Sequence, residues 1–568
     1  MRQFNFVKER ISVRQYSDVK TLLFFTIFII IYLLPGIYGH TPWKQDENYS
    51  FGIIQSMYES GNWLVPTNAG EPFMEKPPLY YWVATIMVHL LSNLLPLHDA
   101  ARTATFLFST LNFYFFILLA KRVFQSKDLS DYRIWLAFAV YICAPGALRH
   151  SHDMFTDTAL TAGATIGLYG LMGLIRQEKV SASALWLCLG TVFTMLSKGV
   201  FIPGVLWISL ILRPLFLPQC RSKNFWRPSL IAGGVALLLI LPWPALLYFK
   251  HPDLFMVWFW DNNIGRFLGF SVSSLGAGAT PTLIPEAIVF FSLPSGILAT
   301  LYFLRHPVKR LFNQDEYAIT MYSLSGLILL QISATSRALY LLPFIAPMAI
   351  LGSRLLLQIK PKPLQYFSYF ASIFWSGLIL LLWCVYFLKL THDQKEWLAT
   401  FDRWLPMGYE MHFSWLPFIF AFTVTVLWFC RRYLYGSANQ PLRAALDWGA
   451  GITATWGILF TLFIGWIDYA KGYEGVFSAL RNQLVGQYRE SDCMASYKIG
   501  ESEAPMLYYF TGILHQRQTM FEQPEHCRWL IILSDHIPPP PEGMELFWYG
   551  NRPGEKRNNL VVYRILRR

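Results

Sequence analysis

The sequence predicts an α-helical membrane protein that crosses the bilayer many times and ends in a small soluble domain of helices and strands. Three observations lead to this prediction. Of the 568 residues, 54% are hydrophobic and only 14% are charged, whereas a soluble domain carries about 25% charged residues. Apolar runs of the length that crosses about 30 Å of hydrocarbon recur from residue 21 to beyond residue 449. From about residue 470 the chain becomes polar.

The first apolar run, 21–38, follows a basic segment, as in a secretory signal peptide. The run is long, and no small-residue cleavage site precedes Asp46. We therefore expect a retained first span with the N-terminus in the cytoplasm.

The positions of the basic residues indicate how many of the apolar runs cross the membrane. Apolar runs start near residues 21, 79, 101, 133, 157, 183, 200, 228, 283, 317, 338, 366, 414 and 449. If all of them cross, basic pairs such as Lys121 and Arg122 fall outside, against the positive-inside rule. If the run 79–96 instead lies in the interface, these basic loops all become cytoplasmic. The sequence therefore predicts thirteen spans, with the C-terminus outside.

The same topology divides the chain into two domains, a membrane domain at 1–469 and a soluble outer domain at 470–568. The outer segments of the membrane domain are then 39–100, 146–156, 249–282 and 389–413. The predicted elements of the outer domain are a helix, Ala504–Leu514, and strands at Cys527–Leu533, Glu545–Tyr549 and Asn559–Ile565. Its only cysteines, Cys493 and Cys527, either form a disulfide or remain two separate thiols; the sequence leaves both open.

The net charge of +12 sits in short basic clusters between spans, and we find no nucleic-acid-binding motif, so we expect no nucleic-acid partner. The outer side gathers ionisable residues at the mouths of spans: Asp46, Glu47, Glu75, Lys76, Asp153, Asp157, Lys198, Arg266 and Arg337, with Tyr340. Such groups at membrane depth are costly and indicate function. Lysine and arginine would hold a phosphate, and a carboxylate would accept a proton from an attacking hydroxyl.

Each of these residues also has a simpler interpretation. Asp46 and Glu47 fit a solvated loop start, and Lys198 and Arg337 fit interfacial cations that snorkel. Asp153 and Asp157, expected one helical turn apart, fit a helix cap and first-turn charge. A metal at His150, His152 and Asp153 is less favoured than solvated side chains.

The strongest pointer to function is a resemblance. Its pieces are DENY at 46–49, GNWLVP at 61–66, EKPPLYYW at 75–82, Ala101-Arg102, Asp157, SKG at 197–199, NNIGRF at 262–267 and RALYLLP at 337–343. Their order over about 350 residues resembles the bacterial aminoarabinose transferase and protein O-mannosyltransferase group, glycosyltransferases of the GT-C fold that use polyprenyl-phosphate sugars.

The resemblance implies an inverting transfer of one sugar from undecaprenyl phosphate to lipid A, another glycan or a protein, on the periplasmic face of a bacterial inner membrane. It implies Asp46 and Asp157 as catalytic carboxylates. It also implies that the lipid phosphate is bound by Lys76, Lys198, Arg266, Tyr340 and Arg337. Further site candidates are Glu47, Glu75, Arg102 and Asp153.

One position departs from the family. Where aminoarabinose transferases have a histidine that can share a metal with the glutamate of the EKP motif, this chain has Asn263. We therefore expect no essential metal at Glu75, and the sugar, the acceptor and the oligomeric state stay unidentified. The alternative functions are a lipid-linked sugar flippase or transporter, a glycan polymerase or ligase, and a non-catalytic scaffold. The absence of an internal sequence repeat speaks against the transporter.

Overall fold

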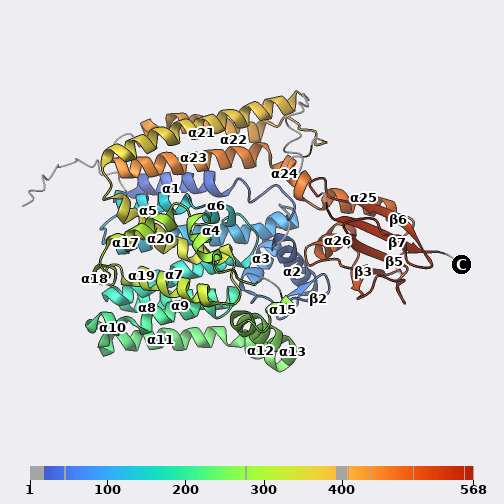
Figure 1. Cartoon of the computed structure of the whole chain (residues 1–568), viewed down its shortest axis with the longest axis horizontal. Helices are drawn as coiled ribbons and strands as arrows, with labels where there is room; N and C mark the ends of the chain where they lie inside the picture. The colour runs from blue at the N-terminus through green and yellow to red at the C-terminus, as the bar shows by residue number, and fades with distance from the viewer. Residues whose placement is uncertain are drawn as a thin grey trace, which may run out of the picture.

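The structure is a computed structural model that describes residues 18–566, except 44–45, 276–277, 392–405, 407, 436–437, 490–491 and 556. A body of roughly parallel helices carries a small sheet domain at one end (Figure 1). The predicted outer segment 389–413 falls largely outside the described residues.

Every predicted span contains a helix, because only a helix satisfies its own backbone groups in hydrocarbon. These helices are α1 (Asp18–Leu33), α4 (Leu97–Val123), α5 (Tyr132–Ile142), α7 (Thr156–Arg176), α8 (Val180–Lys198), α9 (Phe201–Ile211), α11 (Lys223–Ile240), α16 (Leu283–Val289) with α17 (Ser295–Arg305), α19 (Tyr317–Ile332), α20 (Leu342–Leu356), α21 (Pro361–Leu390), α22 (Trp415–Leu434) and α23 (Gln440–Leu462).

The lengths of these helices vary more than the sequence suggested. Within the described residues, 7 helices are long and apolar enough to cross a membrane on their own, or 8 if α23 and α24 (Ile464–Lys471), which meet at a 68° bend, form one span. Others, such as α5 and α19, are shorter apolar helices. The run that was predicted to lie in the interface forms α3 (Leu79–Leu91), which has only 13 residues.

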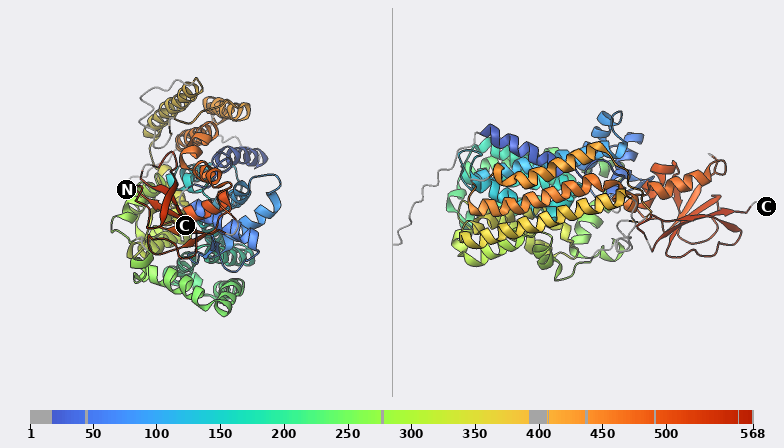
Figure 2. Two further views of the ribbon diagram at one scale, coloured as in Figure 1. Left: turned by 90° about the vertical axis from the view of Figure 1, so that its right-hand side faces the viewer. Right: turned by 90° about the horizontal axis from the view of Figure 1, so that it is seen from above.

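The connecting segments lie at the two ends of the body. The short helices α10 (Arg213–Phe216) and α18 (Val308–Leu311) lie at the end remote from the sheet domain (Figure 1). The opposite end carries α2 (Asp46–Ser60), α3, the hairpin of β1 (Thr67–Asn68) and β2 (Glu71–Pro72), α12 (Pro242–Lys250), α13 (Pro252–Met256) and α15 (Val272–Leu275). Helices α21, α22 and α23 lie side by side along one flank of the body (Figure 2).

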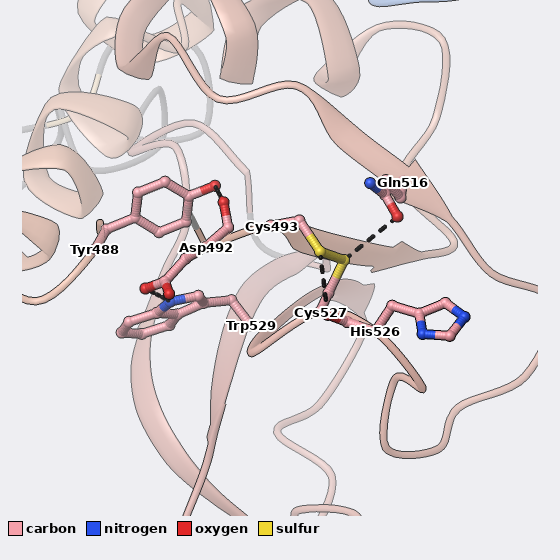
Figure 3. Close-up of a disulfide and its surroundings, with 7 residues drawn as sticks. All are labelled: Tyr488, Asp492, Cys493, Gln516, His526, Cys527 and Trp529. Carbon is pink, nitrogen blue, oxygen red and sulfur yellow. Dashed lines mark hydrogen bonds between the residues drawn. A yellow bond between two sulfur atoms is a disulfide. The ribbon is translucent and has the colours of Figure 1, made fainter. Parts of the chain in front are cut away.

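The sheet domain confirms the strands and the helix predicted for the tail. Its strands are β3 (Met494–Tyr497), β4 (His515–Arg517), β5 (Trp529–Ser534), β6 (Met544–Gly550) and β7 (Asn559–Ile565), in the order β4-β3-β5-β7-β6. β3 runs parallel to β4 and β5, and β7 runs antiparallel to β5 and β6. The helices are α25 (Glu474–Leu484) and α26 (Glu503–Thr511). Cys493 and Cys527 form a disulfide (Figure 3), which decides the alternative that the sequence left open.

The sheet domain packs directly on one end of the helical body, the end that carries α2 and α3. A single buried apolar cluster joins side chains of α2, α3 and α4 to α25, α26 and β5. Polar contacts surround this cluster: Arg517 Nε lies 3.0 Å from Glu71 Oε1, and Tyr508 donates a hydrogen bond of 2.6 Å to Glu59. The outer domain therefore covers the face on which the predicted site residues stand.

Candidate active site

The first turn of α2 carries two adjacent acidic residues with different surroundings. Acidic groups at this position are favourable with the helix dipole. Tyr49, one turn further on, donates a hydrogen bond of 2.7 Å to Asp46 Oδ1, and its hydroxyl accepts one from Lys76 Nζ. Lys76 also lies over the Tyr49 ring, 4.7 Å from its centroid. Tyr49 thus connects the carboxylate at the start of α2 to the lysine of the EKPP segment.

Lys76 faces a cavity of about 390 Å³ at the outer end of the helical body. The cavity lies between the loop before α3, the junction of α8 and α9, the segment after α13, and the ends of α19 and α20. Its charged and phenolic lining groups are those that the sequence assigned to a lipid phosphate: Lys76, Lys198, Arg266 and Tyr340, together with Glu75. Apolar side chains such as Leu160, Phe201 and Leu329 complete the wall. A cavity of this kind suits an anionic head group with an apolar tail.

Two acidic residues hold the cations of the cavity in place. Arg266 Nη1 lies 2.9 Å from Glu75 Oε1. Lys198 Nζ forms an ion pair with Asp157 Oδ1, and it lies 4.5 Å from the centroid of the Tyr340 ring. Asp157 is fully buried, and its Oδ2 has no hydrogen-bond partner among the described residues. Asp157 therefore contacts the cavity through Lys198.

Glu75 and Lys76, in the loop before α3, stabilise each other's charged form. Burial alone would raise the pKa of Glu75, but Lys76 and Arg266 bring that pKa below its ordinary value. Burial alone would lower the pKa of Lys76, but Glu75, Asp46 and Asp157 bring that pKa above its ordinary value. Lys76 therefore keeps its positive charge although its side chain is almost completely buried.

A π-helix forms part of the cavity wall. This element, η2 (Val257–Gly265), carries Asn262 and Asn263 and leads into α14 (Arg266–Leu268). π-Helices are rare and often mark functional sites. Asn263 Nδ2 donates to the Trp258 carbonyl at 2.8 Å, and a Cβ on Gly199 would lie 2.0 Å from Asn263 Oδ1. Gly199, with φ +90°, therefore lets the end of α8 approach η2 closely.

Other predicted candidates lie in a separate buried network. The Arg102 side chain is fully buried, with Nη2 3.2 Å from Glu47 Oε2 and Nη1 3.2 Å from Asp99 Oδ1. It also donates to the carbonyls of His40 and Thr41. Glu47 in turn accepts from the backbone amides of Trp43 and Met154, both at 3.0 Å. Glu47 and Arg102 fasten α2, α4 and the loop before α7 together and do not line the cavity.

Two further candidates, Asp153 and Arg337, do not line the cavity. Asp153 was expected one helical turn from Asp157, but α7 begins only at Thr156, and Asp153 lies in the preceding turn. There Asp153 accepts a hydrogen bond of 2.7 Å from His150 and does not line the cavity. Arg337 precedes the short 3-10 helix η3 (Ala338–Leu341); its side chain is exposed and also lies outside the cavity wall.

Glu501 is a site neighbour that the sequence reasoning missed. It belongs to the outer domain, and its carbonyl accepts a hydrogen bond of 3.0 Å from Asn68 in the β1–β2 hairpin. Burial and the nearby Glu75 raise the pKa of its carboxyl, which Lys76 partly opposes. No sequence motif links position 501 to the EKPP segment, because only the packing of the outer domain brings them together.

Within the described parts of the chain, no three histidine, cysteine, aspartate or glutamate side chains lie close enough to hold an ion together. Glu75, the candidate ligand, pairs with Arg266, and Asn263 uses its amide on Trp258 and on the Val200 backbone.

Comparison with curated proteins confirms the family resemblance. The undecaprenyl phosphate-alpha-4-amino-4-deoxy-L-arabinose arabinosyl transferase of Pseudomonas savastanoi is 26% identical over 349 residues, which are 61% of this chain and 62% of that protein. The enzyme of the same name from Aeromonas hydrophila is 26% identical over 340 residues, 57% of each chain. The chain thus spans about three fifths of the length of these relatives. No protein-family model matches it.

Comparison with solved structures confirms the fold. The crystal structure of ArnT from Cupriavidus metallidurans bound to undecaprenyl phosphate matches with a TM-score of 0.68 at 14% identity, covering 96% of this chain and 98% of that one. The apo structure of the same protein matches with a TM-score of 0.65. The shared architecture therefore includes both the helical body and the C-terminal sheet domain.

Proposed function

We propose that the protein is an inverting membrane glycosyltransferase that moves one sugar from undecaprenyl phosphate to an acceptor on the outer face of a bacterial inner membrane. One observation carries the proposal: Lys76, Lys198 and Arg266 come from three distant parts of the chain and converge on a single cavity with an otherwise largely apolar wall. The names of the relatives agree with this chemistry.

The three cations form the site for the donor phosphate in this proposal. The guanidinium of Arg266 can hold two phosphate oxygens at once, while lysines act as point charges. Glu75 and Asp157 fix the positions of Arg266 and Lys198, so that little reorganisation is needed when charge develops on the leaving phosphate. The apolar side chains of the wall would contact the first isoprene units of the lipid.

The transfer breaks the bond between the anomeric carbon and the phosphate oxygen, and its electron pair stays on the phosphate. The acceptor oxygen attacks the opposite face of the sugar and forms the new bond, which inverts the anomeric carbon. With a hydroxyl acceptor, Asp46 takes the proton. With a phosphate acceptor no proton needs to be removed, and Asp46 acts by orienting the acceptor. The hydrogen bond from Tyr49 holds Asp46 in position.

The proposal names the donor and the acceptor by chemical class. We propose undecaprenyl phosphate bearing one sugar as donor, and lipid A, another glycan or a protein as acceptor. The relatives' names make 4-amino-4-deoxy-L-arabinose the first sugar to test. In the membrane, residues 1–469 would form the transferase body with a cytoplasmic N-terminus, and residues 470–568 would form a periplasmic domain above the cavity. Asp46 lies at that end of the body, which agrees with transfer on the outer face.

The proposal is tested by release of undecaprenyl phosphate from purified protein in lipid. The donors are a panel of undecaprenyl-phosphate sugars, and the acceptors are lipid A, envelope glycans and envelope proteins. We expect release by the wild type and a loss of at least about 100-fold in Asp46→Asn. Neither Asp46 nor Glu59 lines the cavity, but only Asp46 is linked to Lys76, through Tyr49. Glu59→Gln, near the other end of the same helix, therefore serves as the matched control and should keep full activity.

The alternatives predict other results. Equal release by wild type and Asp46→Asn would remove Asp46 from the mechanism. No release from any donor, with movement of labelled donor across the bilayer, would establish a flippase instead. A polymeric product would establish a polymerase.

A further inference from the structure

A second polar cavity, of about 440 Å³, lies in the sheet domain, separate from the cavity at Lys76. Its polar lining residues are Gln487, Arg489, Arg528, Glu545 and Arg564. Arg564 stands near the end of β7 and Arg528 directly before β5, at the end of the sheet that points away from the helical body (Figure 1). The membrane-remote tip of the domain is therefore both hollowed and lined by three arginines.

The positive charges of this tip cavity are only partly neutralised. Arg564 donates to Glu545 Oε1 at 3.0 and 2.6 Å and to Gln487 at 3.0 Å. Arg528 Nη1 lies 3.8 Å from Asp492 Oδ2. The guanidinium of Arg489 has no partner among the described residues, although its backbone amide donates to Asp492 at 3.2 Å. Among the described residues, three guanidinium groups thus meet two carboxylates, Glu545 and Asp492.

The disulfide holds Arg528 beside its partner Asp492. Cys493 follows Asp492, and Cys527 precedes Arg528, so the disulfide joins the segments that carry both groups (Figure 3). Trp529 also holds Asp492 in place, because its indole donates a hydrogen bond of 3.2 Å to Asp492 Oδ2. Its fully buried ring lies 5.9 Å from the guanidinium carbons of both Arg528 and Arg564. The cavity is therefore held in shape before any ligand binds, which favours affinity.

We propose that the tip cavity is a second anion site, which binds a phosphate group of the acceptor. The chemistry follows from the guanidinium group, whose planar fork matches phosphate oxygens. The donor phosphate has its own proposed site at Lys76, at the opposite end of the sheet domain, so the phosphate at the tip belongs to a part of the acceptor remote from the oxygen that attacks. The identity of the acceptor rests on the proposed function, whereas binding of phosphate at the tip does not.

Phosphate binding is tested first, without turnover. Full-length protein in lipid nanodiscs is saturated with undecaprenyl phosphate, and inorganic phosphate is then titrated and followed by ³¹P NMR line broadening. We expect Arg489→Ala with Arg528→Ala to weaken phosphate binding by about tenfold or more, since each lost charge-assisted contact contributes roughly that factor. Arg481→Ala, on α25 of the same domain but outside the cavity, should bind like the wild type. Unchanged binding in the double variant overturns the site.

The assignment to the acceptor is tested by turnover with a phosphorylated acceptor and with its dephosphorylated form. We expect the double variant to raise KM for the phosphorylated acceptor by about tenfold with unchanged kcat, and to leave KM for the dephosphorylated form unchanged. An equal KM increase for both forms contradicts the assignment. If no acceptor turns over at all, the proposed function fails, while the NMR titration still decides whether the tip binds phosphate.

Discussion

Two charged clusters on the outer end of the helical body use the same residue types in opposite ways. Around Arg102, the carboxylates of Glu47 and Asp99 and several backbone groups saturate one guanidinium completely. Around the cavity, Lys76, Lys198 and Arg266 have fewer partners and line an open space. Asp46 and Glu47 are neighbours in sequence, yet each belongs to a different cluster.

The extent to which a charged group is paired with protein groups distinguishes a structural residue from a functional one better than burial does. Lys76 and Arg102 are both buried, at 7% and 0% exposure. The difference lies in the hydrogen-bond donors that remain for a ligand. In the Arg102 cluster, protein groups already occupy the guanidinium donors, whereas the cations of the cavity keep some of their donors for a ligand. Substitutions in the first cluster should therefore cost stability, and substitutions in the second should cost activity.

The largest expected effect is on stability. Arg102→Met removes the cation and leaves Glu47 and Asp99 buried without it, which should destabilise the protein by about 3–5 kcal/mol. The measurement is the melting temperature and the yield of monodisperse protein in detergent. A variant that melts like the wild type would show that this cluster does not hold α2 and α4 together.

The next effect is on activity. Lys76→Met should lower kcat/KM by about 10²–10³-fold, the range for losing one preorganised charge contact to a developing anion. Its melting temperature should stay within a few degrees of the wild type, because Glu75 keeps Arg266 as a partner. Steady-state kinetics and melting are measured on the same preparation. A stability loss as large as that of Arg102→Met would erase the difference between the two clusters.

A smaller effect is expected at the wall of the cavity. Gly199→Ala would bring a methyl group to 2.0 Å from Asn263 Oδ1 at a backbone φ of +90° that alanine avoids. The carboxamide must move, and Lys198 is the preceding residue, so we expect about a tenfold fall in kcat/KM. Gly204→Ala is the matched control, because a Cβ there meets nothing within 4 Å although the residue also lines the cavity. Equal kinetics for the two variants would contradict the close packing of α8 on η2.

The smallest effect is a pH dependence of stability at Glu501. Its pKa is raised in the folded protein by burial and by Glu75, so the folded state holds a proton that the unfolded state has lost. Stability therefore falls as pH rises from the ordinary pKa of glutamate, about 4.3, through the raised value. Glu501→Gln removes this loss, so its melting temperature should exceed that of the wild type increasingly as the pH rises from about 4 through the raised pKa. A difference that does not change with pH would contradict a raised pKa at Glu501.

Sequence reasoning predicted most of the fold because its signals are local. Apolar runs, basic loops and the strand-like segments of the tail are each readable within about twenty residues. It also identified the cations of the cavity, because the resemblance placed Lys76, Lys198 and Arg266 together. It also named Arg337 and Asp153, which do not line the cavity, because position in the sequence does not say which way a side chain points.

What sequence reasoning missed depends on long-range packing. Glu501 reaches the site only because the outer domain packs on the β1–β2 hairpin. The π-helix Val257–Gly265 has no distinctive residue pattern, and it forms where Asn262 and Asn263 both bond back to carbonyls five residues earlier. The helices in the thirteen predicted spans also differ in length, which the apolar runs of the sequence did not indicate.

The most direct test of the account is a cryo-electron microscopy structure of the protein with undecaprenyl phosphate. The account predicts phosphate density within hydrogen-bond distance of Lys76 Nζ and the Arg266 guanidinium, with the lipid chain leaving along Phe201 and Leu329. Phosphate bound at Arg102, or at any position that leaves Lys76 and Arg266 unliganded, would contradict the division between the two clusters and the function built on it.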